Sequence, residues 1–244
     1  MNTLADIRIA CWSGPRNIST ALMRSWSSRN DTFVSDEPFY AYYLKETGLN
    51  HPMAEEIINY YPNTYNQVVN SINKKIPESK KIWYQKHMAH HLIDIKNIDW
   101  VKNFHNCFLI RHPKDVINSY IRKNQLNHID ELGYPQQWKL IEYLIENKKD
   151  IIVIDSSILL EDPKKILNEW CKNLNIEFNE TMLSWEKGPY STDGIWWKHW
   201  YNNVTNTNQF ELFDKKSNTI PNRYQDIYNE ALDYYKKLYY FVVQ

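Results

Sequence analysis

Short apolar runs, separated by longer amphipathic stretches, set the hydrophobic pattern of this chain of 244 residues. Several of the runs are apolar throughout rather than alternating with polar residues. Continuous apolarity is typical of strands in a parallel sheet, because helices cover both of its faces. The pattern predicts strands over Ile7–Trp12, Thr32–Ser35, Lys81–Gln85, Cys107–Ile110 and Ile151–Ile154.

The stretches between these runs repeat their apolar residues with the period of a helix. Pro113 and Pro163 stand where the first turn of a helix accepts proline. Strands that alternate with helices predict an α/β fold, a parallel β-sheet flanked by helices on both faces, in a single domain over residues 1–244. The segment Trp185–Phe210 fits neither period and is expected to be a long ordered loop. Helices are predicted over Ile18–Arg29, Met53–Asn73, Pro113–Lys123, Pro135–Lys148, Pro163–Leu174 and Pro221–Leu238.

The composition narrows the class of protein. Lysine plus arginine balance aspartate plus glutamate, 29 against 29, so no general attraction to nucleic acid or anionic membranes is expected. No apolar run approaches the roughly 20 residues of a membrane span, and Met1–Asp6 lacks the pattern of a signal peptide. The three cysteines, Cys11, Cys107 and Cys171, lie far apart without metal-binding spacing. We therefore expect a reduced, cytoplasmic protein with no nucleic-acid or membrane partner. The sequence does not indicate the oligomeric state.

The most informative stretch follows the first predicted strand. The chain breaks at Ser13–Pro15 and enters a helical pattern that carries Arg16, Ser19 and Thr20 at its start. A strand, a tight loop and a helix N-terminus together cradle a phosphate-like group, because free amides and the positive helix end face the loop. Arg16 adds a fork of donors suited to phosphate or sulfate oxygens. The lysine of the ATPase loop G-x-x-x-x-G-K-[ST] is absent.

A second anion-binding pattern follows the fourth predicted strand. That strand ends at Arg111, a helix begins at Pro113, and Ser119 lies 119 − 111 = 8 positions on, about two helical turns along. An arginine at a strand end and a serine on the next helix can converge on one anion at the carboxyl edge of a parallel sheet. A structural ion pair between Arg111 and Asp115 is the alternative.

The two patterns together resemble the donor-binding motifs of sulfotransferases. Pro15–Thr20 resembles their 5′-phosphosulfate loop, often P-[KR]-S-G-T-T, and Ile110–Ser119 resembles their 3′-phosphate motif. The resemblance implies a P-loop-type fold and transfer of a sulfuryl group from 3′-phosphoadenosine 5′-phosphosulfate (PAPS) to a hydroxyl or amine of a small-molecule acceptor, without a metal. The donor-binding residues that it implies are Gly14, Pro15, Arg16, Asn17, Ile18, Ser19, Thr20, Arg111, Ser119, Lys187 and Gly188.

Four blocks are similar to a sulfotransferase-like subfamily that is associated with branched-chain aminotransferase-like proteins. These blocks are Ser13–Met23, Asp36–Ala41, Gln85–Ala89 and Asp193–Trp197. The resemblance runs from about Ile7 to Phe210, nearly the whole chain. It therefore implies one sulfotransferase-like domain.

The run Lys86–His91 supplies the predicted chemistry at the acceptor. In the family a histidine shortly after this strand removes the acceptor proton, and a neutral imidazole suits that role because its ordinary pKa is about 6.5. His87 is the first candidate, beside Lys86 in the family's Lys-His pattern, and His91 is the reserve. Glu37, at the end of the second strand, could bind an acceptor cation, orient His87 or serve as the alternative base. The clustered histidines lack carboxylate or thiolate partners at zinc-binding spacing, so no metal site is expected. The predicted catalytic residues are His87, Arg16, Lys86 and Glu37.

Two other functions stay open from the sequence. A P-loop kinase with a degenerate loop would lack the usual lysine, although Asp155 stands at a strand end where a magnesium ligand could lie. A nucleotide- or anion-binding protein without catalysis is favoured by Ile18, which replaces a glycine of the family's loop and would make the loop tighter. Lys187 and Gly188 match the family's C-terminal donor motif only loosely.

Overall fold

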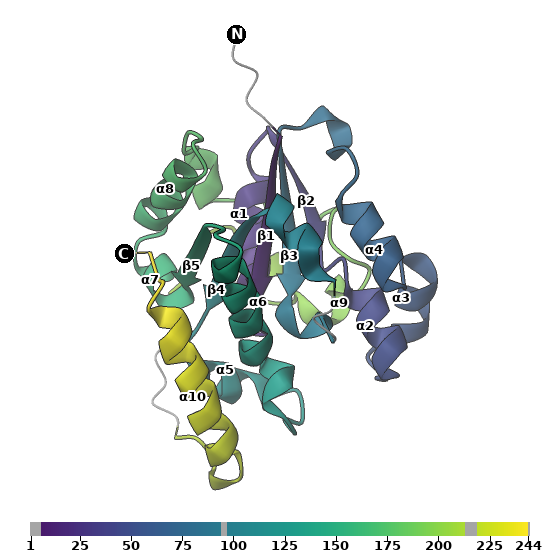
Figure 1. Ribbon diagram of the computed structural model, residues 1–244, viewed down its shortest axis with the longest axis vertical. Helices are drawn as coiled ribbons and strands as arrows, with labels where there is room; N and C mark the ends of the chain where they lie inside the picture. The colour runs from purple at the N-terminus through teal and green to yellow at the C-terminus, as the bar shows by residue number, and fades with distance from the viewer. Residues whose placement is uncertain (1–5, 94–96, 213–218, 244) are drawn as a thin grey trace.

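A five-stranded parallel sheet forms the centre of the described part of the chain (Figure 1). The computed structural model describes residues 6–93, 97–212 and 219–243, so the expectation about Met1–Asp6 lies almost entirely outside them. The strands run in the order β2-β3-β1-β4-β5, and all neighbours are parallel. This confirms the predicted α/β class. The strands are β1 (Ile7–Ser13), β2 (Thr32–Asp36), β3 (Ile82–Met88), β4 (His105–Ile110) and β5 (Ile151–Asp155).

Strand β1 lies in the middle of the sheet and explains the continuous apolar runs. Ile9 and Cys11 pack into one buried cluster, whereas Ala10 and Trp12 pack into another. Successive side chains of a strand point to opposite faces. Because helices cover both faces of this sheet, both sets of positions must be apolar.

The helices form two layers, and a smaller helical group lies beside one end of the sheet (Figure 1). The described α-helices that pack into the cluster of Ile9 and Cys11 are α1 (Ser19–Ser27), α7 (Ser156–Glu161) and α8 (Pro163–Asn173). Those that pack into the cluster of Ala10 and Trp12 are α4 (Tyr65–Ile72), α5 (Pro113–Tyr120), α6 (Tyr134–Glu146) and α10 (Gln225–Tyr239). The smaller group contains α2 (Tyr40–Thr47), α3 (Ala54–Tyr60) and α9 (Trp197–Trp200).

The helix predicted over Met53–Asn73 is wrong in one respect, because the structure divides it into α3 and α4. Tyr61, which precedes Pro62, adopts an extended conformation with φ −109° and ψ 161°. The residue before a proline disfavours helical geometry, so α3 ends there. Thr64 then caps α4, its side chain accepting a hydrogen bond from the Gln67 amide at 3.4 Å.

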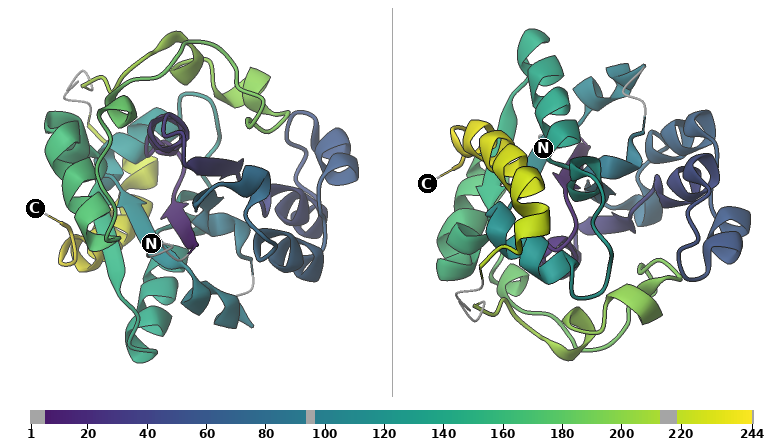
Figure 2. Two further views of the ribbon diagram at one scale, coloured as in Figure 1. Left: turned by 90° about the horizontal axis from the view of Figure 1, so that it is seen from above. Right: turned by 90° about the horizontal axis from the view of Figure 1, so that it is seen from below.

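The segment Trp185–Phe210 runs along the periphery of the molecule in both views of Figure 2. Its ends are tied together, since the Trp185 amide bonds to the Asn208 carbonyl at 2.8 Å. Inside it the short helix α9 interrupts the loop that the sequence predicts. Among the described residues, Cys11, Cys107 and Cys171 are free and buried thiols. No helix in these ranges combines the length and apolarity needed to cross a membrane.

Candidate functional site

The turn from β1 into α1 combines close packing with unusual backbone geometry. A Cβ added to Gly14 would lie 2.0 Å from the Leu132 carbonyl oxygen, so only glycine fits at this position. Arg16 (φ 64°) and Ile18 (φ 57°) both adopt the left-handed conformation. Within the described residues no side chain caps the start of α1 at Ile18. The first amides of this helix are therefore available to an anion in the turn.

Ile18 is a strained residue, because a β-branched side chain is a rare occupant of the left-handed region. We predict that Ile18→Gly is more stable than Ile18→Ala by about 1 kcal/mol and therefore unfolds at a higher temperature. Both variants lose the branched part of the isoleucine side chain, but only alanine keeps a Cβ, which is what disfavours the left-handed conformation. In an ordinary helix the order is the reverse. Thermal unfolding of the pair measures this, and a more stable alanine variant would contradict the assigned backbone strain.

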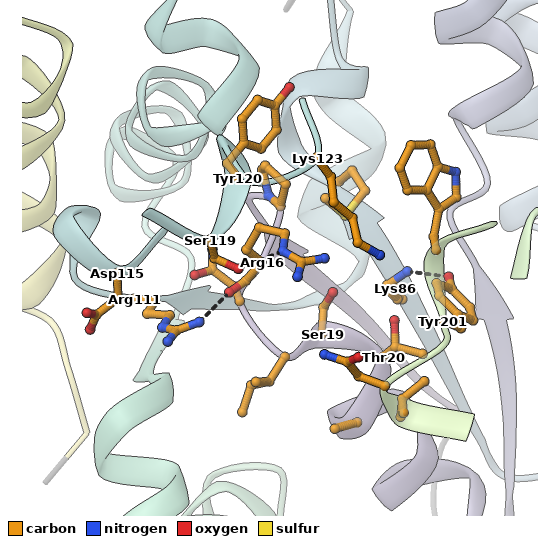
Figure 3. A pocket seen from close by; sticks show the side chains of 18 of the residues that line it. Arg16, Ser19, Thr20, Lys86, Arg111, Asp115, Ser119, Tyr120, Lys123 and Tyr201 are labelled. Atoms are coloured by element: carbon orange, nitrogen blue, oxygen red, sulfur yellow. Dashed lines mark hydrogen bonds between the residues drawn. The ribbon is translucent and has the colours of Figure 1, made fainter. Parts of the chain in front are cut away.

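Arg16 joins the two anion-binding patterns of the sequence. Its Nε donates a hydrogen bond to Ser119 Oγ at 2.9 Å, and Arg111 Nη1 donates to the Arg16 carbonyl at 3.0 Å (Figure 3). Burial and the neighbouring Arg122 lower the pKa of Arg16, and burial also lowers that of Arg111. Lowered pKa values mean that the positive charges are held at a cost in free energy, which a bound anion would offset.

A cavity of about 590 Å³ opens at the carboxyl edge of the sheet, where the turns after β1, β2, β3 and β4 meet (Figure 3). Ligands of open α/β folds bind at this edge. Cations outnumber carboxylates among its described lining residues, which suits an anionic ligand. The lysines and arginines are Arg16, Lys86, Arg111, Arg122 and Lys123, and the carboxylates are Glu37, Asp115 and Glu211. Of the predicted site residues, Pro15–Thr20, Glu37, Lys86, Arg111 and Ser119 line the cavity.

Lys86 is held by three acceptors at the wall of this cavity. Its Nζ lies 2.9 Å from Asp36 Oδ1 and 2.5 Å from Glu37 Oε1. The third contact is Tyr201 Oη at 2.7 Å, which Figure 3 shows as a dashed line. An ammonium group has three N–H donors, so these contacts use all of them. Lys86 is therefore placed to fix Glu37 rather than to bind a ligand directly.

Burial and the neighbouring charges together shift the pKa of Glu37 and of Lys86. Burial raises the pKa of Glu37 above its ordinary value of 4.5, and the Lys86 ammonium opposes this shift without cancelling it. Burial alone would lower the pKa of Lys86, but the carboxylates of Asp36 and Glu37 raise it above its ordinary 10.5. Glu37 also has a left-handed backbone, φ 42°. A carboxylate with a raised pKa in a cavity is suited to accept a proton.

His87 lies in the core rather than at this cavity. The structure extends β3 to Met88, three residues beyond the predicted end, and successive residues of a strand point to opposite faces. Because Lys86 faces the cavity, His87 faces the other way, stacks on Trp12 at 4.4 Å and is 1% exposed. Burial lowers its pKa to about 3. It is not among the described lining residues, whereas the reserve candidate His91 is.

A comparison of the sequence with models of protein families agrees with this fold and cavity. A family model described as "Sulfotransferase domain" matches residues 7–240. The chain belongs to the sulfotransferase family. The kinase alternative loses its support with this match, and Asp155 has a structural role instead: its side chain caps α7 by accepting a hydrogen bond from the Ser157 amide at 2.8 Å.

Two curated relatives share sequence with this family member. The branched-chain-amino-acid aminotransferase-like proteins 2 and 1 of Arabidopsis thaliana are each 31% identical to it over 230 residues. The match covers 94% of this chain and 41% of each relative. The chain therefore spans about two fifths of the length of the curated relatives it matches.

Solved sulfotransferase structures share the fold at low sequence identity. The sulfotransferase domain from the Synechococcus PCC 7002 olefin synthase superposes with a TM-score of 0.60 at 18% identity, over 97% of both chains. A sulfotransferase from Alicyclobacillus acidocaldarius gives 0.54 at 11% identity over 98% of both chains. The sulfotransferase domain from the curacin biosynthetic pathway gives 0.53 at 15%, over 93% of this chain and 97% of that one. These matches establish the architecture of this chain.

Three predicted donor-binding residues lie away from the described cavity lining. Gly14 is buried beneath the turn, and Lys187 is exposed on the peripheral segment. Gly188 has a structural contact instead, its amide bonding to the Thr205 carbonyl at 2.8 Å. That segment is anchored by a buried ion pair between Arg24 and Asp193 at 2.6 Å.

Several lining residues are absent from the sequence-based site. Lys123, four positions beyond the predicted Ser119 and just after the end of α5, points into the cavity (Figure 3). Tyr201 accepts the third hydrogen bond of Lys86, and Trp200, the preceding residue, also lines the cavity. No local pattern in the segment Trp185–Phe210 indicates which of its rings reaches the cavity.

Proposed function

We propose that this protein transfers a sulfuryl group from PAPS to a hydroxyl or amine of a small-molecule acceptor. The observation that carries the proposal is the contact of Arg16 with both Ser119 and Arg111, which joins the two donor motifs at one end of the cavity. A 5′-phosphosulfate would lie against the turn Pro15–Thr20 and the start of α1. The 3′-phosphate would be bound by Arg111 and Ser119.

We assign proton removal to Glu37. The acceptor oxygen or nitrogen attacks sulfur, the bond from sulfur to the 5′-phosphate oxygen breaks, and its electron pair leaves with 3′-phosphoadenosine 5′-phosphate. The acceptor proton passes to the Glu37 carboxylate. Glu37 replaces His87 in this role because it lines the cavity and has a raised pKa, whereas His87 is enclosed by the core. Base catalysis of this kind contributes roughly 10² to 10⁴ in rate.

The cations supply the electrostatic part of the reaction. Arg16 and the amides of the turn stabilise the charge that develops on the sulfuryl and phosphate oxygens. Lys86 holds the Glu37 carboxylate through Oε1 and keeps it oriented. Holding the reacting groups in one geometry lowers the barrier further, because orientation no longer has to be achieved by chance.

The pH dependence follows from the raised pKa of Glu37. The Glu37 carboxylate must be ionised to accept a proton. We therefore expect kcat/KM to fall as the pH drops through the pKa of Glu37 in the folded protein, which lies above 4.5. We expect the acid limb of the pH profile above that ordinary value and expect Glu37→Gln to abolish it. A limb at or below the ordinary value would contradict the assignment of Glu37.

A labelled-donor assay tests the transfer itself. PAPS carrying labelled sulfur is incubated with the protein and a panel of small alcohols and amines, and labelled products are separated. We expect at least one labelled product. A protein that binds the nucleotide without catalysis, the alternative favoured by Ile18, would bind 3′-phosphoadenosine 5′-phosphate yet yield no labelled product from any acceptor.

A further inference from the structure

Five of the aromatic rings among the described lining residues lie in contact with one another, and we call these five the aromatic wall. They come from four separate parts of the chain, which only the fold brings together. Tyr40 stacks on His91 with ring centroids 4.9 Å apart, and His90 lies 4.5 Å from His91. The members of the wall are Tyr40, His51, His90, His91 and Trp200.

The wall is continuous on its far side as well. His51 Nδ1 lies 2.9 Å from Tyr40 Oη, and the His51 ring meets Trp200 edge to face at 6.1 Å. His91 is enclosed between Tyr40 and Tyr43, whose ring centroids lie 4.9 and 4.6 Å from its own, so it holds the wall in place. The half-buried rings of His51, His90 and Trp200 keep surface for a ligand at this end of the cavity. A rigid set of ring faces attracts a cation through the negative face of each ring.

The imidazoles of the wall carry no positive charge at neutral pH. Burial lowers the pKa of His90 to about 3 and holds that of His91 well below its ordinary value. Burial lowers the pKa of His51 as well. Neutral imidazoles act as aromatic surfaces, so they would not repel a cationic ligand.

The charged groups beside the wall have a net charge of −1. Asp36 and Glu37 contribute two carboxylates and Lys86 one ammonium, whose three donors are already used within the group. Burial raises the pKa of the Tyr40 hydroxyl, and the nearby Glu37 carboxylate raises it further. Arg122 lies near Arg16 at the donor end of the cavity, where burial and then the charge of Arg122 lower the pKa of Arg16. Among the described lining residues, Arg16 and Arg111 belong to the donor motifs, Lys123 enters the cavity from beyond α5, and Glu37 is the carboxylate beside the rings.

We propose that the acceptor is a small alcohol that carries a quaternary ammonium or a protonated amine. The proposal rests on the proposed function, and it deepens it by naming the acceptor class. The cationic group lies against the aromatic wall near Glu37, and the hydroxyl points toward the sulfuryl group. In the transfer, the hydroxyl proton passes to Glu37 and the acceptor oxygen forms the new bond to sulfur, so the ammonium group is unchanged.

Choline and 3,3-dimethylbutan-1-ol test this directly, because they have the same shape and differ in the charge of the quaternary centre. Binding of each to the protein saturated with 3′-phosphoadenosine 5′-phosphate is measured by calorimetry, and each is also offered with labelled PAPS. We expect choline to bind at least about tenfold more tightly, the range of a desolvated cation–π contact. Equal binding, tighter binding of the neutral alcohol or no binding of either would overturn the proposal.

A matched pair of variants assigns the effect to the wall. Trp200→Leu should remove most of the preference for choline, whereas Trp197→Leu should keep it, because Trp197 is not among the described residues that line the cavity. Loss of the preference in both variants, or in neither, would overturn the role given to the wall. Nucleotide binding in the same titrations is read separately, so sulfation of a phenol or sugar alone would reject this acceptor class and leave the proposed transfer intact.

Discussion

Replacing Glu37 by glutamine should lower kcat by about 10² to 10⁴ while leaving the affinity for 3′-phosphoadenosine 5′-phosphate within a few-fold of the wild type. Glutamine keeps the size of the side chain and an oxygen for Lys86, whose Nζ lies 2.5 Å from Glu37 Oε1. It cannot accept a proton at neutral pH, so the chemical step loses its base while the donor end of the cavity is unchanged. Steady-state kinetics with a saturating donor, together with calorimetric titration of the nucleotide, measure both quantities.

The matched control is His87→Gln, which replaces the base that the sequence favours. His87 stacks on Trp12 and contacts Gln85 Oε1 at 3.1 Å, so its loss should reduce stability by about 1 kcal/mol, as is common for a buried residue. Its kcat, corrected for the folded fraction, should change by less than about threefold, far below the loss of a general base. A large loss of kcat in His87→Gln with Glu37→Gln unaffected would reverse the assignment.

Replacing Arg111 by alanine should weaken binding of 3′-phosphoadenosine 5′-phosphate by roughly 10- to 150-fold. The guanidinium would lose charge-assisted hydrogen bonds to the 3′-phosphate, worth about 1.5–3 kcal/mol. Adenosine 5′-phosphate lacks the 3′-phosphate, so its weaker binding should change little in the same variant. Titration of both nucleotides into both proteins isolates the effect.

Arg8→Ala provides the control for removal of an arginine from the same sheet. Arg8 lies near the start of β1, at the opposite edge from the cavity, and donates to the Lys74 carbonyl at 2.9 Å. Its variant should bind both nucleotides as the wild type does. If Arg111→Ala weakened the two nucleotides equally, Arg111 would be supporting the turn through the Arg16 carbonyl rather than reading the 3′-phosphate.

The sequence predicts the sheet well because its signal is local. In β1 the alternation of two buried faces requires an apolar residue at almost every position, and a proline opens α5 at Pro113. The division of the Met53–Asn73 stretch is also local in origin, since Pro62 stands inside it. Its helical periodicity conceals that break, because the apolar residues of α3 and α4 continue the same pattern.

The site is predicted less completely, for a physical reason. Arg16 and Arg111 follow the ends of β1 and β4, and Ser119 lies on the helix that begins just after Arg111, so their positions along the chain place them at the carboxyl edge of the sheet. His87 depends on where β3 ends, and a difference of three residues decides whether it follows the strand or lies within it. Once it lies within the strand, it must point away from the face that Lys86 occupies. Tyr201 reaches Lys86 from 115 positions away, a contact that no local pattern can indicate.

Calorimetric titration of the wild-type protein with 3′-phosphoadenosine 5′-phosphate and with ATP tests the central claim most directly. The titration requires no acceptor, and it probes the donor end of the cavity, where Arg16 contacts Ser119 and Arg111. We predict at least about tenfold tighter binding of 3′-phosphoadenosine 5′-phosphate, the value of the charge-assisted contacts to its 3′-phosphate. Equal or tighter binding of ATP would contradict the assignment of PAPS as the donor.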